Sequence, residues 1–248
     1  MATLHFLGTG AALSEPHRTT TMLGIASEEV FWLIDCGGDV LQRAMAAGLH
    51  PDRFAGLILT HEHPDHVSGF PLFIEKMWLA GRHAPLPVYG PREALEQARR
   101  CFATFDTHSW TGLPALLWHV IPPEEHTLFY EDARWRMWAS PGVHGVPTLG
   151  IRIEDRTTGR SMTYSSDTEP CASIARLAHG STLLVHEATG KGPGHSSAEE
   201  AAHIAQEAGV HRLFLVHLPA TFPRDDIERA RRIFPHTHPA EELGKDSF

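Results

Sequence analysis

Short apolar runs recur along the chain and predict buried β-strands. Such runs lie at 2–7, 30–34, 55–59, 183–185 and 213–216, and each is followed within two residues by glycine, histidine or an acidic residue. Their branched side chains and their length of a few residues favour strands over helices. Two pairs of neighbouring segments, 19–26 with 30–35 and 148–154 with 160–164, are close enough in the chain to form hairpins. The pattern therefore predicts a layered α/β fold.

Apolar residues at helical spacing predict helices between these strands. One face of the segment 69–80 carries Phe70, Phe73, Ile74, Met77 and Trp78. This face belongs either to the core or to a subunit interface. Further helices are expected at 91–103, at about 198–208 with Ser196 or Ser197 as the cap, and at about 224–233, followed by a short tail.

Composition points to one compact domain. The chain has 248 residues, of which 42% are hydrophobic, so we predict a single domain over 1–248. No stretch approaches the roughly 18 apolar residues of a membrane helix, and the amino terminus resembles a first strand rather than a signal peptide. The three cysteines are far apart and form no C-x-x-C pair, which suits a reducing cytoplasm. The net charge of -9 argues mildly against a broad nucleic-acid-binding face, although a local basic funnel can exist within an acidic total.

A group of possible metal ligands directly follows the run 55–59, namely His61, His63, Asp65 and His66. Pro64 keeps His63 out of the helical region, so we expect these side chains on an irregular loop at the strand's end. Imidazole and carboxylate suit zinc-like ions, and the spacing lets His61 and His63 share one ion while Asp65 and His66 face a second. A lone H-x-H would be a weak signal in a chain with 19 histidines, but H-x-H-x-D-H after a buried strand is specific.

The same arrangement recurs at four other predicted strand ends, which carry His144, Asp167, Glu187 and His217. Loops at strand ends are where layered α/β folds build their sites. Taken alone, His144 or His217 is more often a structural histidine. Together with the first group they complete two three-ligand sets, with Asp167 between them.

These motifs, from Phe6-Leu7-Gly8-Thr9-Gly10 to His217, resemble the metallo-β-lactamase superfamily and, within it, the ribonuclease Z group. The resemblance implies a four-layer αββα sandwich with two divalent ions, zinc in the first place, although such ligands also accept manganese or iron. It implies that one ion is held by His61, His63 and His144, the other by Asp65, His66 and His217, and that Asp167 bridges them.

Two further motifs carry the resemblance to the ribonuclease Z group. The segments His186-Glu187-Ala188-Thr189 and His195-Ser196-Ser197 resemble that group's H-E-A-T and H-S-T elements. The resemblance implies that Glu187 and His195 assist proton transfer to the leaving oxygen. Without it, Glu187 would be assigned to an ion pair or a helix dipole and His195 to a plain loop.

The expected chemistry is hydrolysis of a phosphodiester. Two ions about 3.5 to 4 Å apart can hold a hydroxide between them and clamp the attacking and leaving oxygens. Zinc lowers the pKa of bound water to about 7, so the nucleophile exists at neutral pH. Asp65 would orient that water, and a hydrogen-bonded pair of Glu187 and His195 would supply the proton for the leaving alkoxide.

The chain departs from the ribonuclease Z pattern in the expected tRNA contacts. Bacterial members carry a flexible arm that grips the tRNA elbow, whereas here only the segment 154–160 joins two strands in a tight hairpin. The segment 14–19 only loosely resembles the group's basic tRNA-binding loop. Phosphate contacts govern nucleic-acid affinity, so the loss of these basic contacts weakens the case for tRNA. The expected substrate is therefore either RNA, cleaved at its 3′ end, or a small or cyclic phosphodiester.

Two other functions fit part of the pattern. The ligand set also serves lactone and thioester hydrolases of the same fold, although thioester cleavage needs little protonation of the leaving group. A non-catalytic metal-binding protein could retain the fold, but the intact ligand set argues against it. The apolar helix at 69–80 and the resemblance both favour a homodimer, although core burial explains that helix equally well.

Overall fold

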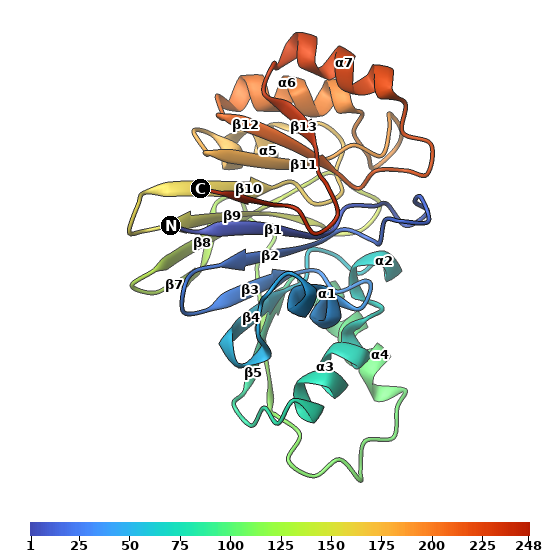
Figure 1. Cartoon of the computed structure of the whole chain (residues 1–248), viewed down its shortest axis with the longest axis vertical. Helices are drawn as coiled ribbons and strands as arrows, with labels where there is room; N and C mark the ends of the chain where they lie inside the picture. The colour runs from blue at the N-terminus through green and yellow to red at the C-terminus, as the bar shows by residue number, and fades with distance from the viewer.

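Two seven-stranded β-sheets pack face to face, and helices cover the outer face of each sheet (Figure 1). The computed structural model describes the backbone of residues 1–248 and every side chain except that of Arg224. This architecture is the αββα sandwich that the sequence resemblance implies. The amino-terminal half supplies most of the first sheet and the carboxyl-terminal half supplies the second (Figure 1).

The parallel strands of the first sheet all end on the same side of the molecule. In order across the sheet, its strands are β14 (Lys245–Ser247), β1 (Thr3–Gly8), β2 (Met22–Ala26), β3 (Phe31–Ile34), β4 (Phe54–Ile58), β5 (Leu86–Gly90) and β6 (Leu116–Val120). Strands β3 to β6 are parallel, whereas β14, β1, β2 and β3 pair antiparallel. The residues that follow β3 to β6 therefore gather on one side of the molecule.

The second sheet brings its own strand ends to the same side. In order across the sheet, its strands are β13 (Thr237–Pro239), β12 (Arg212–Val216), β11 (Leu183–Glu187), β10 (Arg160–Tyr164), β9 (Leu149–Asp155), β8 (Trp135–Pro141) and β7 (Thr127–Glu131). Strands β10 to β13 are parallel, and β8 points the same way because β9 is antiparallel to both β8 and β10. The Leu149 amide donates to the Thr60 carbonyl at 3.1 Å, so the start of β9 meets the end of β4.

Three apolar layers hold the sandwich together. The layer between the sheets contains large side chains with almost no exposed surface, including Trp32, Trp135 and Tyr164. Helices α1 (Val40–Ala46), α3 (Phe70–Leu79) and α4 (Arg92–Ala103) cover the first sheet. Helices α5 (Ala172–Ala178), α6 (Ala198–Ala208) and α7 (Arg224–Ile233) lie over the second. The longest helix that the structure describes, α4, has 12 residues, well short of the roughly 20 that a membrane-spanning helix needs.

Most of the expected elements are present where the sequence predicts them. Both hairpins form, as β2 with β3 and β9 with β10, and the second is closed by a turn of four residues, 156–159. Ser197, one of the two candidate caps, begins α6: its hydroxyl accepts from the Glu200 amide, and the Glu200 carboxylate accepts in return. The apolar face of α3 is buried in the core, so the core interpretation explains Phe70 and Phe73.

Three segments differ from the sequence predictions. The loop after β4 contains one helical turn, α2 (Pro64–Val67), because Pro64 sits at the first helical position, where a missing N–H breaks no hydrogen bond. Helix α5 was not expected, and its N-cap, Cys171, makes no side-chain capping bond that would have announced it.

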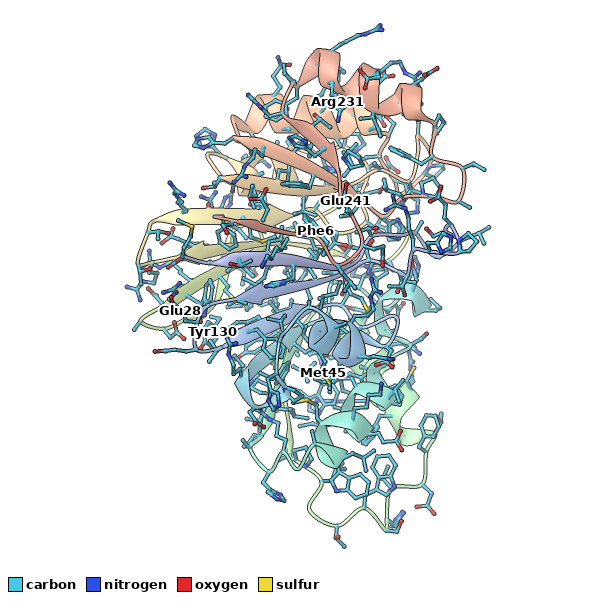
Figure 2. All side chains as sticks on the ribbon, viewed as in Figure 1. Phe6, Glu28, Met45, Tyr130, Arg231 and Glu241 are labelled. Carbon is cyan, nitrogen blue, oxygen red and sulfur yellow. The ribbon has the colours of Figure 1, made fainter. Side chains whose placement is uncertain are left out.

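The tail beyond α7 also differs, because it forms the edge strands β13 and β14 rather than a loose end. The segment between these strands crosses β1, where the Leu243 amide donates to the Phe6 carbonyl at 2.8 Å. Figure 2 shows Phe6 and Glu241 close together on this face. The tail is thus a structural part of both sheets, with β14 at the edge of the first and β13 at the edge of the second.

Candidate metal centre and active site

The strand ends place all seven proposed ligands in one cluster. His61 follows β4, His144 follows β8, Asp167 follows β10 and His217 follows β12. The helical turn α2 presents Asp65 and His66 to the same point. At Ser166 and His217 the backbone is left-handed, with φ of 56° and 55°, and such strain in residues other than glycine is typical of functional sites.

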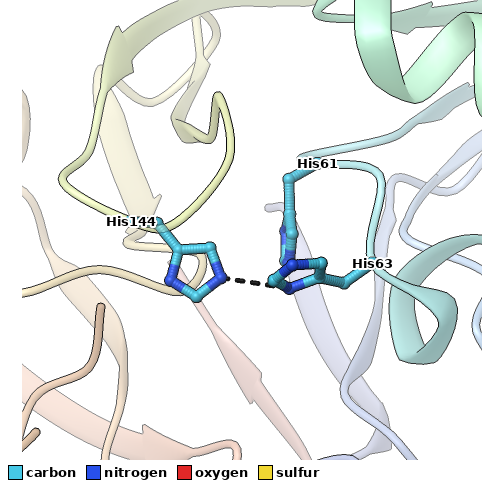
Figure 3. Close-up of side chains that lie close together, drawn as sticks. All are labelled: His61, His63 and His144. Carbon is cyan, nitrogen blue, oxygen red and sulfur yellow. Dashed lines mark hydrogen bonds between the residues drawn. The ribbon is translucent and has the colours of Figure 1, made fainter. Parts of the chain in front are cut away.

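Three histidines form one part of the cluster (Figure 3). His63 Nδ1 and His144 Nε2 are 3.1 Å apart, and the ring centroids of His61 lie 4.8 Å from His63 and 5.1 Å from His144. His144 Nδ1 donates to the Gly194 carbonyl, so His144 Nε2 is left as an acceptor toward His63, and a cation can take the place of the proton between these two nitrogens. The three nitrogens lie within 4.8 Å of one another, a spacing that one ion can bridge.

Two carboxylates and two histidines form the other part. Asp65 Oδ2 lies 3.2 Å from His217 Nε2 and 3.5 Å from His66 Nε2. Asp167 faces both parts: its Oδ1 is 3.6 Å from His66 Nε2, while its Oδ2 is 3.3 Å from His217 Nε2 and 3.9 Å from His61 Nε2. Asp167 Oδ2 therefore approaches one histidine of each part, while Oδ1 faces the second part alone, so this carboxylate lies between the two parts.

Unsatisfied atoms at the centre of the cluster fit a divalent cation. Within the described part of the chain, His61 Nε2, His66 Nε2 and Asp167 Oδ1 are buried and have no hydrogen-bond partner. Leaving such groups unpaired costs roughly 1–3 kcal/mol each, and more for a charged group. Divalent ions bound in the two parts of the cluster would satisfy these atoms, and the nitrogen and oxygen donors suit a zinc-like metal.

The protonation of the cluster also suits a cation. Burial lowers the pKa of His61 well below its usual value and lowers that of His63, so both rings are held neutral. Although burial alone would raise the pKa of Asp167, the charges of His217 and His66 hold it well below its usual range. Burial opposes a charged His66, yet Asp167 and Asp35 raise its pKa well above normal. A proton on His66 and a metal ion therefore compete for the same place.

A second set of contacts fixes the imidazole rings. His66 Nδ1 donates to Asp35 Oδ2 at 2.9 Å, and both side chains are fully buried. His144 Nδ1 donates to the Gly194 carbonyl at 2.6 Å. His217 Nδ1 lies 2.6 Å from the Thr189 hydroxyl. In each ring the other nitrogen, Nε2, is left to face the cluster, as is usual for metal-binding histidines.

Glu187 and His195 lie beside this cluster and contact each other. His195 Nδ1 is 3.0 Å from Glu187 Oε1. Glu187 has no exposed surface and also accepts from the backbone amides of Thr168, Thr189 and Ser196, which fixes its carboxylate. The His195 ring stacks on His217 with centroids 5.7 Å apart. The hydrogen bond to Glu187 raises the pKa of His195, against the effect of burial, so its protonated form is favoured.

All nine residues proposed from the sequence therefore converge, but the sequence reasoning missed their supports. Asp35 was taken only as the end of a strand, and Thr189 only as part of a motif. Asp35 shares the signal that identified the ligands, an acidic residue directly after a buried strand. Its left-handed φ of 61° and its partner 31 residues away are visible only in the fold.

The fold and this site define an αββα protein with the ligand set of a metal-dependent hydrolase. The family model described as a Beta-lactamase superfamily domain matches residues 32–218. A ribonuclease Z from Ignicoccus hospitalis is 30% identical, with 96% of this chain and 96% of the relative covered. A ribonuclease Z from Methanothermobacter thermautotrophicus is 29% identical over 98% of this chain and 95% of the relative. The chain therefore belongs to the beta-lactamase superfamily, in its ribonuclease Z-like group.

Solved structures agree on the fold. Human short-form tRNase Z matches with a TM-score of 0.79 at 24% identity, covering 99% of this chain and 98% of that one. The metallo-beta-lactamase fold protein YhfI from Bacillus subtilis matches with a TM-score of 0.80 at 23% identity, covering 98% of each chain. The alignment with the Methanothermobacter relative spans 297 positions, more than the 248 residues of this chain. That relative therefore has insertions that this chain lacks.

Proposed function

We propose that this protein is a zinc-dependent phosphodiesterase of the ribonuclease Z type. The observation that carries the proposal is the hydrogen bond between Glu187 and His195 directly beside the histidine and aspartate cluster. A phosphodiester leaves an alkoxide, which needs a proton, and this pair is placed to provide one. The ribonuclease Z relatives that cover nearly the whole chain support the same reaction class.

In this proposal two zinc ions share the seven ligands. His61, His63 and His144 hold the first ion, Asp65, His66 and His217 hold the second, and Asp167 bridges them. The close approach of Asp167 to His61, His66 and His217 supports the bridging role. Manganese or iron would fit the same donors, so the choice of zinc rests on the majority of imidazole ligands.

Each residue of the active site has a defined task. When bound, the two ions would supply Lewis acidity to the phosphoryl oxygens and make a water molecule acidic enough to attack at neutral pH. Asp65 contacts His66 and His217 through Oδ2, which leaves Oδ1 to orient the attacking water. Protonated His195, bonded to Glu187 through Nδ1, has Nε2 free to donate to the leaving oxygen. Glu187 stabilises the protonated form of His195 and fixes the orientation of its ring.

The proposed substrate is RNA cleaved near its 3′ end, or a smaller phosphodiester. The relatives' names support RNA. The turn at 156–159 leaves no arm between β9 and β10 with which to grip a large RNA, and the net charge of -9 gives little general attraction for one. A short RNA or a dinucleotide needs no such arm.

A substrate panel tests the proposed reaction. The zinc-loaded protein is incubated with a chromogenic phosphodiester, a phosphomonoester, a thioester, a lactone and a precursor tRNA. We expect turnover of the phosphodiester, and precursor tRNA cleavage would add RNA to its substrates. Turnover of only the thioester or the lactone would contradict the proposal and favour the alternative hydrolases. No turnover despite two bound ions would favour a non-catalytic metal-binding protein.

We also propose a cytoplasmic homodimer. The three cysteines, Cys36, Cys101 and Cys171, are all free, as a reducing compartment would keep them. Helix α3 exposes 38% of Leu72 and 68% of Leu79 on the surface opposite its buried face, which leaves apolar surface for a second copy. Light scattering after gel filtration should give twice the chain mass of 27.4 kDa, and a monomer at every concentration would refute the dimer.

A further inference from the structure

A cleft of about 470 Å³ opens beside the loop that carries His144. Its walls come from three places: the start of α4, the end of β6 with the residues that follow it, and the loop before β9. The walls include Pro91, Arg92, Val120, Ile121, Pro122 and Pro147. The volume lies in the ordinary range for small-molecule sites, about 300–1,000 Å³.

The cleft adjoins the metal cluster. Pro147 follows His144 by three residues, so their Cα atoms are at most about 11 Å apart. The ends of the neighbouring strands are tied together, since the Leu59 amide donates to the Tyr89 carbonyl and the Ile121 amide to the Gly90 carbonyl, both at 2.8 Å. The cleft therefore flanks the end of β4, from which His61 and His63 follow.

The chemistry of the walls suits an uncharged group with apolar faces. Proline, valine and isoleucine side chains form most of the surface, and the proline rings are rigid. The two charged residues, Arg92 and Glu93, have opposite signs, so the cleft carries no net charge to attract a phosphate. Val120 on β6 is 49% exposed, which leaves apolar surface open to a ligand.

We propose that this cleft is the subsite for a nucleobase on a nucleotide that carries the scissile phosphate. The inference rests on the proposed phosphodiesterase function, because a nucleobase is the uncharged ring that a nucleotide holds within this reach of its phosphate. Apolar walls contact ring faces rather than base edges, so binding tolerates different bases. The subsite makes nucleoside phosphodiesters better substrates than simple alkyl ones.

Three esters with the same leaving group test the subsite: thymidine 3′-(4-nitrophenyl phosphate), its 5′ isomer and methyl 4-nitrophenyl phosphate. The variant Val120→Trp fills the cleft, and Leu117→Trp is the matched control, since Leu117 is a similarly exposed residue of β6 that does not line the cleft. We expect Val120→Trp to lower kcat/KM at least tenfold for one or both thymidine esters and less than twofold for the methyl ester. The ester that loses more identifies which side of the phosphate carries the bound base.

The outcomes separate the subsite from the reaction itself. Equal losses for all three esters, or no loss for either thymidine ester, would overturn the nucleobase subsite while leaving the phosphodiesterase function standing. If the unsubstituted protein cleaved none of the esters, the proposed function would fail first. Pro122→Trp narrows the cleft from a second position on the same wall and must give the same selective loss, which guards against misfolding of the first variant.

Discussion

A hydrogen bond of 3.0 Å joins the carboxylate of Glu187, which has no exposed surface, to the partly exposed ring of His195. The carboxylate cannot turn away, because three backbone amides also donate to it. The ring therefore has one fixed nitrogen and one available nitrogen. A general acid requires this arrangement, in which Glu187 holds Nδ1 and Nε2 can donate its proton to the leaving oxygen.

Replacing His195 by alanine should slow phosphodiester hydrolysis by on the order of 10² or more without removing metal. The loss should be large for esters of ribose or alkyl alcohols and small for 4-nitrophenyl esters, because nitrophenolate leaves without a proton. Rates on both ester types, with metal content by atomic absorption, check this. His203→Ala, at an exposed histidine of α6, is the control, and an unchanged rate in His195→Ala would remove it from the mechanism.

Glu187→Gln should lower the rate less than loss of the ring does. The amide can still hold His195 in place, but it no longer stabilises the imidazolium, so a smaller fraction of the histidine carries the proton to be donated. We expect kcat to fall by on the order of tenfold or more with KM nearly constant, again mainly for poor leaving groups. A change in KM alone would show that Glu187 acts on substrate binding instead.

Asp167→Ala should reduce metal occupancy, because this carboxylate is proposed to bridge both ions. We expect fewer than two zinc ions per chain after dialysis against buffered zinc, measured by atomic absorption. Asp106→Ala, at an exposed aspartate, should keep full occupancy. Two retained ions in the Asp167 variant would refute the bridging role.

Asp35→Asn should weaken metal binding although Asp35 touches no ion in the proposal. The carboxylate orients His66 from 2.9 Å, and removing such a support typically costs 10–100-fold in affinity. Zinc titration against a competing chelator measures the change. Asp52→Asn, at an exposed position, should bind like the unsubstituted protein, and equal affinities in both variants would contradict the role of Asp35.

His186 should make the fold less stable as the pH falls. Burial lowers its pKa, so between the folded value and about 6.5 the unfolded chain binds a proton that the folded chain refuses. Its contribution is thus present above pH 6.5 and is lost as the pH drops toward the folded pKa, by at most about 1.4 kcal/mol per pH unit. In His186→Asn, urea unfolding between pH 7 and 5 should show a shallower dependence than in His211→Asn. Identical slopes would contradict the assignment.

The ligands could be predicted from the sequence because each follows a buried strand, and strand ends in a parallel arrangement meet at one edge. His61, Asp167 and His217 were found in this way. The supporting contacts could not, since Asp35 reaches His66 only after two strands and a helical turn have packed. Nor could β13 and β14, which have three residues each and depend on pairing with distant strands rather than on local preference.

The position of β14 next to β1 has a consequence for biosynthesis. Strand β2, the partner of β1 on one edge, is made soon after β1, but the other edge of β1 stays open until β14 has been made. A contact in this region, between Thr9 and Glu242, joins residues 233 positions apart. An unpaired strand edge is a template for aggregation while the chain is growing. Nascent copies stalled before residue 240 should therefore depend on chaperones more than the completed chain does.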